Sequence, residues 1–162
     1  MADVIIDHPN RDKAESKATK AIVFVLLLVS AALVFIVTLG GWSQLQGAQI
    51  VAFAYIGLYV LMAYYVARWN RGILPVAAAL AVLLAVVAAV SGPAWFARDK
   101  AGFLDPTLPP SVLGLLTVIL VPVSLLLLAF AMRGFQQKWN VEVERRADDR
   151  GQGHRGGAPQ PA

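Results

Sequence analysis

Residues 21–41 read AIVFVLLLVSAALVFIVTLGG, and this stretch decides the fold class of the chain. Apart from Ser30, Thr38 and the closing glycines, every side chain in it is apolar. A helix of this length is about 30 Å long, which matches the hydrocarbon thickness of a bilayer. The stretch is too long for the apolar part of a signal peptide, so we expect it to remain as a membrane helix.

Three further apolar runs follow, over residues 48–67, 73–92 and 112–132. The whole chain is 58% hydrophobic and 15% charged, whereas a soluble domain is about 45–50% apolar and about 25% charged. The excess of apolar side chains must therefore face lipid. The sequence predicts an all-α bundle of four transmembrane helices within residues 21–132, with an outer loop over 93–111.

Lysine and arginine are unevenly distributed between the two sides of this bundle. The first 20 residues hold four of them, the connection between the second and third runs holds two, and the residues after 132 hold six. The other side has only Arg98 and Lys100. Because cytoplasmic flanks retain positive charge, we expect both termini in the cytoplasm. A composition rich in Ala, Val, Leu, Arg and Gly suggests the plasma (inner) membrane of a bacterium.

Residues 1–20 form a polar lead before the first span. Within it, residues 11–20 favour a helix that extends the first span inward, from a cap near Asn10. Ahead of them, Val4, Ile5 and Ile6 form an isolated apolar triplet. Two interpretations of this triplet stay open: a frayed chain end or a small docking patch for a partner.

The residues after the fourth span divide into two parts. Phe135, Trp139 and Val143 recur at four-residue spacing, which predicts a cytoplasmic helical extension over residues 133–146 with one apolar face. Residues 147–162 consist largely of Gly, Pro and charged residues without periodicity, so a disordered tail is expected there.

The chemistry of the spans is limited. Ionisable residues inside a membrane mark functional sites by default, and residues 21–67, 73–97 and 112–132 contain none. This excludes most proton relays, carboxylate-coupled carriers and voltage sensors. The chain has no Cys, and its two histidines, His8 and His154, lie in opposite tails, so neither a metal site nor a bound cofactor is expected.

Neither catalysis nor nucleic-acid binding is predicted by the polar residues. The hydroxyls in the spans have no general base in their own helices, so no catalytic constellation can be assigned. The net charge is +4, but acidic residues offset the cations in both tails and no basic stripe appears.

The third span carries small residues at four-residue spacing. Small side chains at this interval form a smooth ridge that allows another helix to approach closely. We therefore predict helix packing through Ala77, Ala81, Ala85 and Ala89.

Tyr55 and Tyr59 lie one turn apart near the middle of the second span. Their hydroxyls need acceptors in an apolar surrounding, so both rings are expected to face other helices. An internal hydrogen bond and contact with a quinone, lipid headgroup or other ligand both stay open.

Proline and tryptophan mark particular positions in the spans. The third span is expected to close at Pro93, and Pro122 at the centre of the fourth predicts a kink, because its ring frees the carbonyl of Val118. Tryptophans fall at the ends of the spans, where their rings settle at lipid headgroups. The predicted interface anchors are Trp42 and Trp95 on the outer side and Trp69 and Trp139 on the inner side.

No motif in the chain identifies a family. Because the spans lack reactive groups, the sequence favours an accessory or scaffolding subunit of a larger membrane complex, respiratory or transport, with the lipid bilayer and other proteins as its partners. One alternative is an oligomeric carrier or pore for a neutral or apolar solute, with Tyr55, Tyr59 and Pro122 near its path. Another is an enzyme acting on lipid or isoprenoid substrates through Asp99, Asp105 or carboxylates of the tail.

Overall fold

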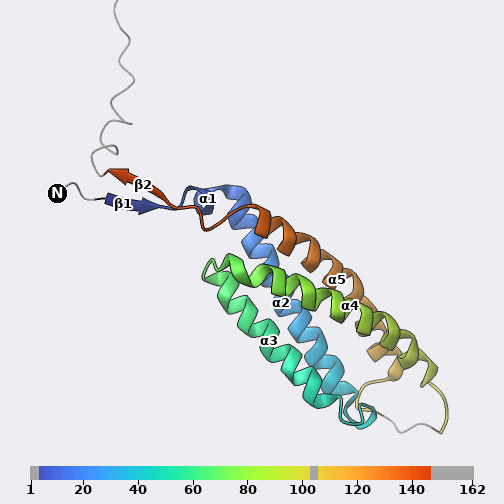
Figure 1. Cartoon of the computed structure of the whole chain (residues 1–162). Coiled ribbons are helices and arrows are strands. Elements are labelled where there is room, and N and C mark those ends of the chain that lie inside the picture. The colour runs from blue at the N-terminus through green and yellow to red at the C-terminus, as the bar shows by residue number, and fades with distance from the viewer. Residues whose placement is uncertain (1–3, 103–105, 147–162) are drawn as a thin grey trace, which may run out of the picture.

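The computed structural model describes residues 4–102 and 106–146 of the chain. It consists of a helical bundle with a short two-stranded ribbon at one end (Figure 1). The predicted disordered tail over 147–162 lies outside the described residues. In chain order the elements are β1 (Val4–Asp7), α1 (Pro9–Asp12), α2 (Ala14–Gly40), α3 (Gln49–Ala67), α4 (Leu74–Ala97), α5 (Pro110–Gln136) and β2 (Val143–Arg146), with short 3₁₀ helices at Trp42–Gln44 and Arg71–Ile73.

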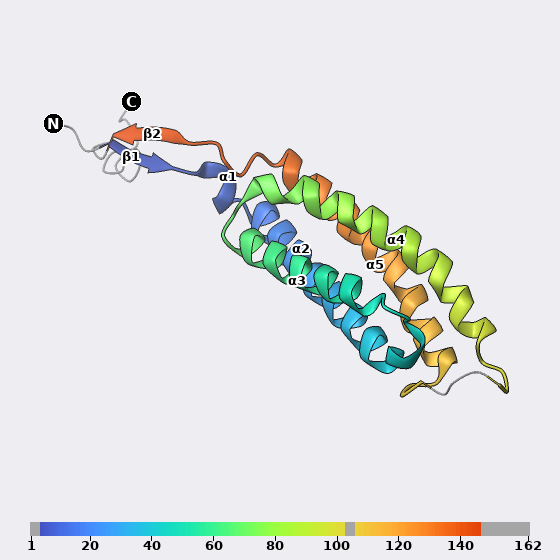
Figure 2. The same cartoon turned by 60° about the horizontal axis from the view of Figure 1, so that its bottom comes forward.

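Four of the helices, α2 to α5, are long and apolar enough to cross a membrane. This confirms the predicted number of spans and the helical fold class. The helices run alternately up and down, so the connections α2–α3 and α4–α5 lie at one end of the bundle, which we call the loop end. The α3–α4 connection and both strands lie at the other, which we call the ribbon end (Figures 1 and 2).

Buried side chains recur every three or four residues, so each helix presents one stripe to its neighbours. Helix α5 packs closely against α4, and α2 packs against both α3 and α5, whereas α3 and α4 make little contact with each other. The alternating spacing is typical of helices that cross at a shallow angle. On α5 the stripe consists of Leu113, Thr117, Leu120, Ser124, Leu127, Ala131 and Gly134.

Helix α4 does not end at Gly92 as predicted but continues through Pro93 to Ala97. A proline removes one backbone hydrogen bond from a helix. Beyond it, the ring of Trp95 is buried beside Gly41 at the end of α2, and Phe96 contacts Gly114 on α5. Burial of the Trp95 ring and the contact of Phe96 with Gly114 stabilise the extra turn. The outer loop is correspondingly shorter than the predicted 93–111.

The predicted helical extension over residues 133–146 is wrong beyond Gln136. Helix α5 ends there, Lys138 adopts a left-handed backbone with φ of 49°, and Trp139 turns back into the protein. The residues that follow form β2 instead of a helix. Its β-branched Val143 suits a strand, and the ring of Trp139 is buried only because the helix stops before it.

Strand β2 pairs antiparallel with β1, with Val4 opposite Arg146 and Asp7 opposite Val143. The apolar triplet 4–6 therefore belongs to a strand rather than to a frayed end. The ribbon extends away from the helices in both views (Figures 1 and 2). Both described chain ends consequently lie on the same side of the bundle.

Candidate functional site

The ribbon end holds most of the polar contacts between segments that are distant in the sequence. Asn10 donates a hydrogen bond from Nδ2 to the carbonyl of Lys138, and Arg11 donates from Nε to the carbonyl of Trp139, both at 3.0 Å. In both bonds a side chain that precedes α2 donates to a backbone carbonyl that follows α5. They fix the two strands of the ribbon relative to the bundle.

A second set of contacts joins the helices themselves at the ribbon end. Gln137 donates from Nε2 to Oγ1 of the buried Thr19 on α2 at 3.0 Å. Arg71, in the α3–α4 connection, donates from Nε to the carbonyl of Phe135 at 2.7 Å, and its guanidinium lies 4.2 Å from the centroid of the Phe135 ring. Three separate parts of the chain are thus held at fixed positions around the end of α5.

Two tryptophans pack together at the centre of this end. Trp139 is 0% exposed, and its ring meets Trp69 edge-on with centroids 5.3 Å apart. Its indole N–H donates to Oε1 of Gln137 at 3.0 Å. Trp69 has a backbone φ of 60°, which is costly for a bulky residue. The contact with Trp139 therefore stabilises Trp69 in a backbone conformation that is unfavourable by itself.

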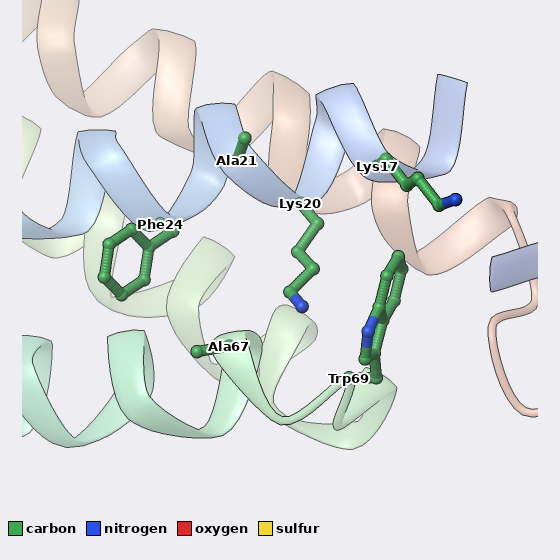
Figure 3. A pocket seen from close by; sticks show the side chains of 6 residues that line it. All are labelled: Lys17, Lys20, Ala21, Phe24, Ala67 and Trp69. Carbon is green, nitrogen blue, oxygen red and sulfur yellow. The ribbon is translucent and has the colours of Figure 1, made fainter. Parts of the chain in front are cut away.

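Trp69 also lines a cavity of about 350 Å³ between the start of α2 and the end of α3 (Figure 3). The ammonium of Lys20 lies 4.1 Å from the centroid of the Trp69 ring. Lys17, one turn earlier on α2, has its ammonium 3.8 Å from Oδ1 of the exposed Asp12. The cavity lining comprises Lys17, Lys20, Ala21, Phe24, Ala67 and Trp69.

A second cavity, of about 220 Å³, lies toward the loop end, where α3 and α4 diverge. Its lining is mainly apolar, and Tyr55 and Thr38 are among its polar members. The hydroxyls of Thr38 and Thr117 donate to the carbonyls four residues earlier, at 2.6 and 2.7 Å. Such bonds use the O–H donors of these hydroxyls within their own helix, so only the acceptor side of each oxygen is left for a ligand.

The two tyrosines singled out by the sequence stack against each other, with ring centroids 5.9 Å apart. Tyr55 lines the second cavity, whereas Tyr59 is 1% exposed and lies in the core. No acceptor for the Tyr59 hydroxyl occurs within the described ranges 4–102 and 106–146, and the same holds for the buried hydroxyls of Ser30 and Ser124. The internal hydrogen bond considered for Tyr59 is therefore not formed in this structure.

The four alanines of the third span do not share one environment. Ala77 and Ala81 are fully buried, Ala85 is half-buried and Ala89 is exposed. A four-residue step advances about 400° around a helix, so a strict four-residue row drifts by about 40° at each step. The buried stripe on α4 corrects this drift with three-residue steps and passes through Leu84, Ala88 and Gly92 instead.

The tryptophans at the helix ends also differ from one another. Trp42 is exposed and Trp69 partly exposed, whereas Trp95 and Trp139 are buried inside the protein. The last two stabilise contacts between helices and do not present their rings to lipid headgroups in this structure, contrary to the expectation.

Pro122 lies on the exposed side of α5, and the helix continues through it. Thr117 and Ser124 are close to Pro122 in the sequence, and their hydroxyls could compensate for the bond lost at the proline. Neither does so, since Thr117 binds the carbonyl of Leu113 and Ser124 has no partner among the residues that the structure describes.

The cavity beside Trp69 was not predicted. Lys20 was counted only as part of the positive-inside bias, and Trp69 only as an interface anchor. The available signal was their position, since Lys20 directly precedes the charge-free run 21–67 and Trp69 lies two residues after it. Their proximity in space could not be derived from this spacing alone.

Fold and site together define a multi-pass helical bundle with a basic, aromatic cavity at its ribbon end. Comparison of the chain with protein-family models, with curated proteins and with solved structures gave no match.

Proposed function

We propose that this protein is an accessory subunit of a larger bacterial membrane complex, respiratory or transport, and that its ribbon holds a soluble partner domain at the cytoplasmic face. The observation that carries the proposal is the β1–β2 ribbon itself. It projects from the bundle, and within the described part of the chain no third strand pairs with it.

A two-stranded ribbon standing alone in water is marginally stable. The outer edges of such a ribbon are a template for an added strand. Its apolar side chains add to this surface, since Ile6 is 58% exposed and Val143 is 39% exposed. A strand contributed by a soluble domain would pair along one edge of the ribbon. Because Ile6 is paired with Glu144 and Val143 with Asp7, the two apolar side chains lie on opposite faces, and the domain would cover one of them.

The contacts at the base of the ribbon support the same function. Asn10 and Arg11 donate hydrogen bonds to carbonyls after α5. These bonds attach the ribbon to the ends of α2 and α5, so a partner bound to the ribbon would be held against the bundle. The distribution of lysine and arginine in the sequence supports a cytoplasmic position for this end.

The test is affinity capture of the full-length protein from its native membrane in mild detergent, followed by quantitative mass spectrometry. Ile6→Asp places a charge on the ribbon. Ile50→Asp is the matched control, because Ile50 is 79% exposed in the first turn of α3 at the loop end, where an acidic residue suits a helix N-terminus. We expect a stoichiometric partner with the wild type and the control, and its loss with Ile6→Asp. A wild-type monomer without a stoichiometric partner contradicts the proposal.

A second candidate function is a carrier or pore for a neutral or apolar solute, formed by an oligomer. The cavity of about 220 Å³ between α3 and α4 favours it, because it lies in the apolar bundle and includes Tyr55. The chain has no Cys, so a single Tyr55→Cys variant can be labelled with a water-soluble thiol reagent. Labelling in intact membranes supports a solute path there, and complete protection argues against it.

A further inference from the structure

We propose that the cavity beside Trp69 binds an anionic phospholipid, with the phosphate held by Lys17 and Lys20 and the first part of an acyl chain on its apolar wall. Three features of the cavity point to this ligand: its level in the membrane, its lining of two chemically different halves and the fixed position of Trp69. The proposal does not depend on the protein having a soluble partner.

The level of the cavity relative to the lipid headgroups follows from the sequence. Lys20 is the last ionisable residue before residues 21–67, a run without Asp, Glu, Lys, Arg or His. Charged side chains are costly within the hydrocarbon and settle at its boundary. Trp69 lies two residues after this run, and tryptophan also favours the headgroup level. The cavity therefore lies where the phosphate of a lipid in the adjacent leaflet would be.

The lining has two chemically different halves. Lys20 projects from α2 toward Trp69, Lys17 lines the same cavity one turn earlier with its ammonium directed away from Trp69, and Phe24 lies one turn deeper (Figure 3). Ala21 and Ala67 complete the apolar half. A phospholipid has the same division, with a phosphate next to acyl carbons, whereas a free anion would leave the apolar half unused.

The charge in the cavity calls for an anion. Two lysines line it, and among the residues that the structure describes no Asp or Glu does. Lys20 faces the Trp69 ring at 4.1 Å, and the carboxylate beside Lys17, that of Asp12, is 3.8 Å away with both side chains exposed. Such an exposed pair contributes little, so the phosphate can take its place. Basic pockets at the cytoplasmic ends of membrane helices suit anionic headgroups.

The wall of the cavity is held in place before any lipid binds. Trp69 packs edge-on against the buried Trp139, and the following turn is closed by a 3.0 Å hydrogen bond from the Gly72 N–H to Oδ1 of Asn70. A prearranged wall lowers the entropic cost of binding.

The experiment titrates the full-length, detergent-purified protein with phosphatidylglycerol or phosphatidylcholine of identical acyl chains and counts bound lipids by native mass spectrometry. The test variant is Lys17→Gln/Lys20→Gln. The matched control is Arg98→Gln/Lys100→Gln, which removes the same charge at the loop end. We expect phosphatidylglycerol to bind the wild type and the control at least about tenfold more tightly than the test variant, since each basic residue near the surface contributes to anionic-lipid attraction.

Three outcomes would overturn the proposal. One is equal affinity of the wild type for the two lipids, and another is an equal loss of affinity in both double variants. The third is full displacement of phosphatidylglycerol by inorganic phosphate at the same concentration, which would mean that the site recognises phosphate alone. Unchanged melting temperatures of the lipid-free variants verify that they are folded.

Discussion

Trp139 has the largest fully buried side chain in the described part of the chain. Its ring lies between Trp69 and Gly134, and its indole N–H has a partner in Gln137. One residue beyond the apolar spans thus connects α5 with the α3–α4 connection. It also forms the support behind the basic cavity.

Replacing Trp139 by alanine should lower the free energy of unfolding by about 3–5 kcal/mol, because it leaves a large cavity and removes the donor to Oε1 of Gln137. Denaturant unfolding in detergent measures this change. Trp42→Ala is the control: its ring is 49% exposed, so a loss of about 1 kcal/mol or less is expected. Equal losses for the two variants would contradict the role assigned to Trp139.

At the scale of the elements, α4 and α5 pack tightly at a glycine. A Cβ on Gly92 would be 2.7 Å from Cγ2 of Val118, whereas a Cβ on Gly57 of α3 would meet no atom within 4 Å. Both glycines lie inside helices, so they differ in packing rather than in local structure. The distance between α4 and α5 therefore depends on the missing side chain at position 92.

Gly92→Val should destabilise the protein by about 1–3 kcal/mol through overpacking, and Val118→Ala in the same chain should recover part of that loss. Gly57→Val should change stability far less. Thermal unfolding of the three variants measures the differences. If Gly92→Val is as stable as Gly57→Val, the α4–α5 contact is not as close as described.

The alanine row of α4 gives a further comparison within one helix. Ala81 is 0% exposed and Ala89 faces outward. Ala81→Leu should cost about 1–3 kcal/mol, and Ala89→Leu should remain within about 0.5 kcal/mol of the wild type. Denaturant midpoints of the two variants would show whether the packing stripe follows the observed path or the straight four-residue row.

At the scale of the whole molecule, both described chain ends leave the bundle on one side and pair as β1 and β2. The α4–α5 connection, with Arg98 and Lys100, lies on the opposite side. The orientation proposed from the charge distribution can therefore be tested at one position on each side.

In intact cells, a membrane-impermeant thiol reagent should label Lys100→Cys and should leave Glu142→Cys unlabelled until the membrane is opened. The chain has no Cys of its own, and both positions are exposed, so the labelling reports on the side of the membrane. The reverse pattern would place the ribbon and the basic cavity on the outer side.

Hydropathy and charge alone determined that four helices long enough to cross a membrane are present, because a long apolar run has no other stable form in lipid. They also located α3 to within a residue, since Arg68 and Trp69 mark its end. Local features were less informative about the helix ends. Pro93 did not end α4, because beyond it Trp95 is buried and Phe96 contacts Gly114 on α5.

Only the tertiary structure decided how the ends of the chain fold and where the cavities lie. Val143 continues the four-residue apolar spacing of Phe135 and Trp139, which suits a helix. Residues 143–146 nevertheless pair with residues 4–7, which are far away in the sequence. The cavity beside Trp69 likewise needs Lys20 and Trp69 side by side, across the whole of α2 and α3. Periodicity reports which face of a segment is apolar, but it carries no information on which distant segment that face will meet.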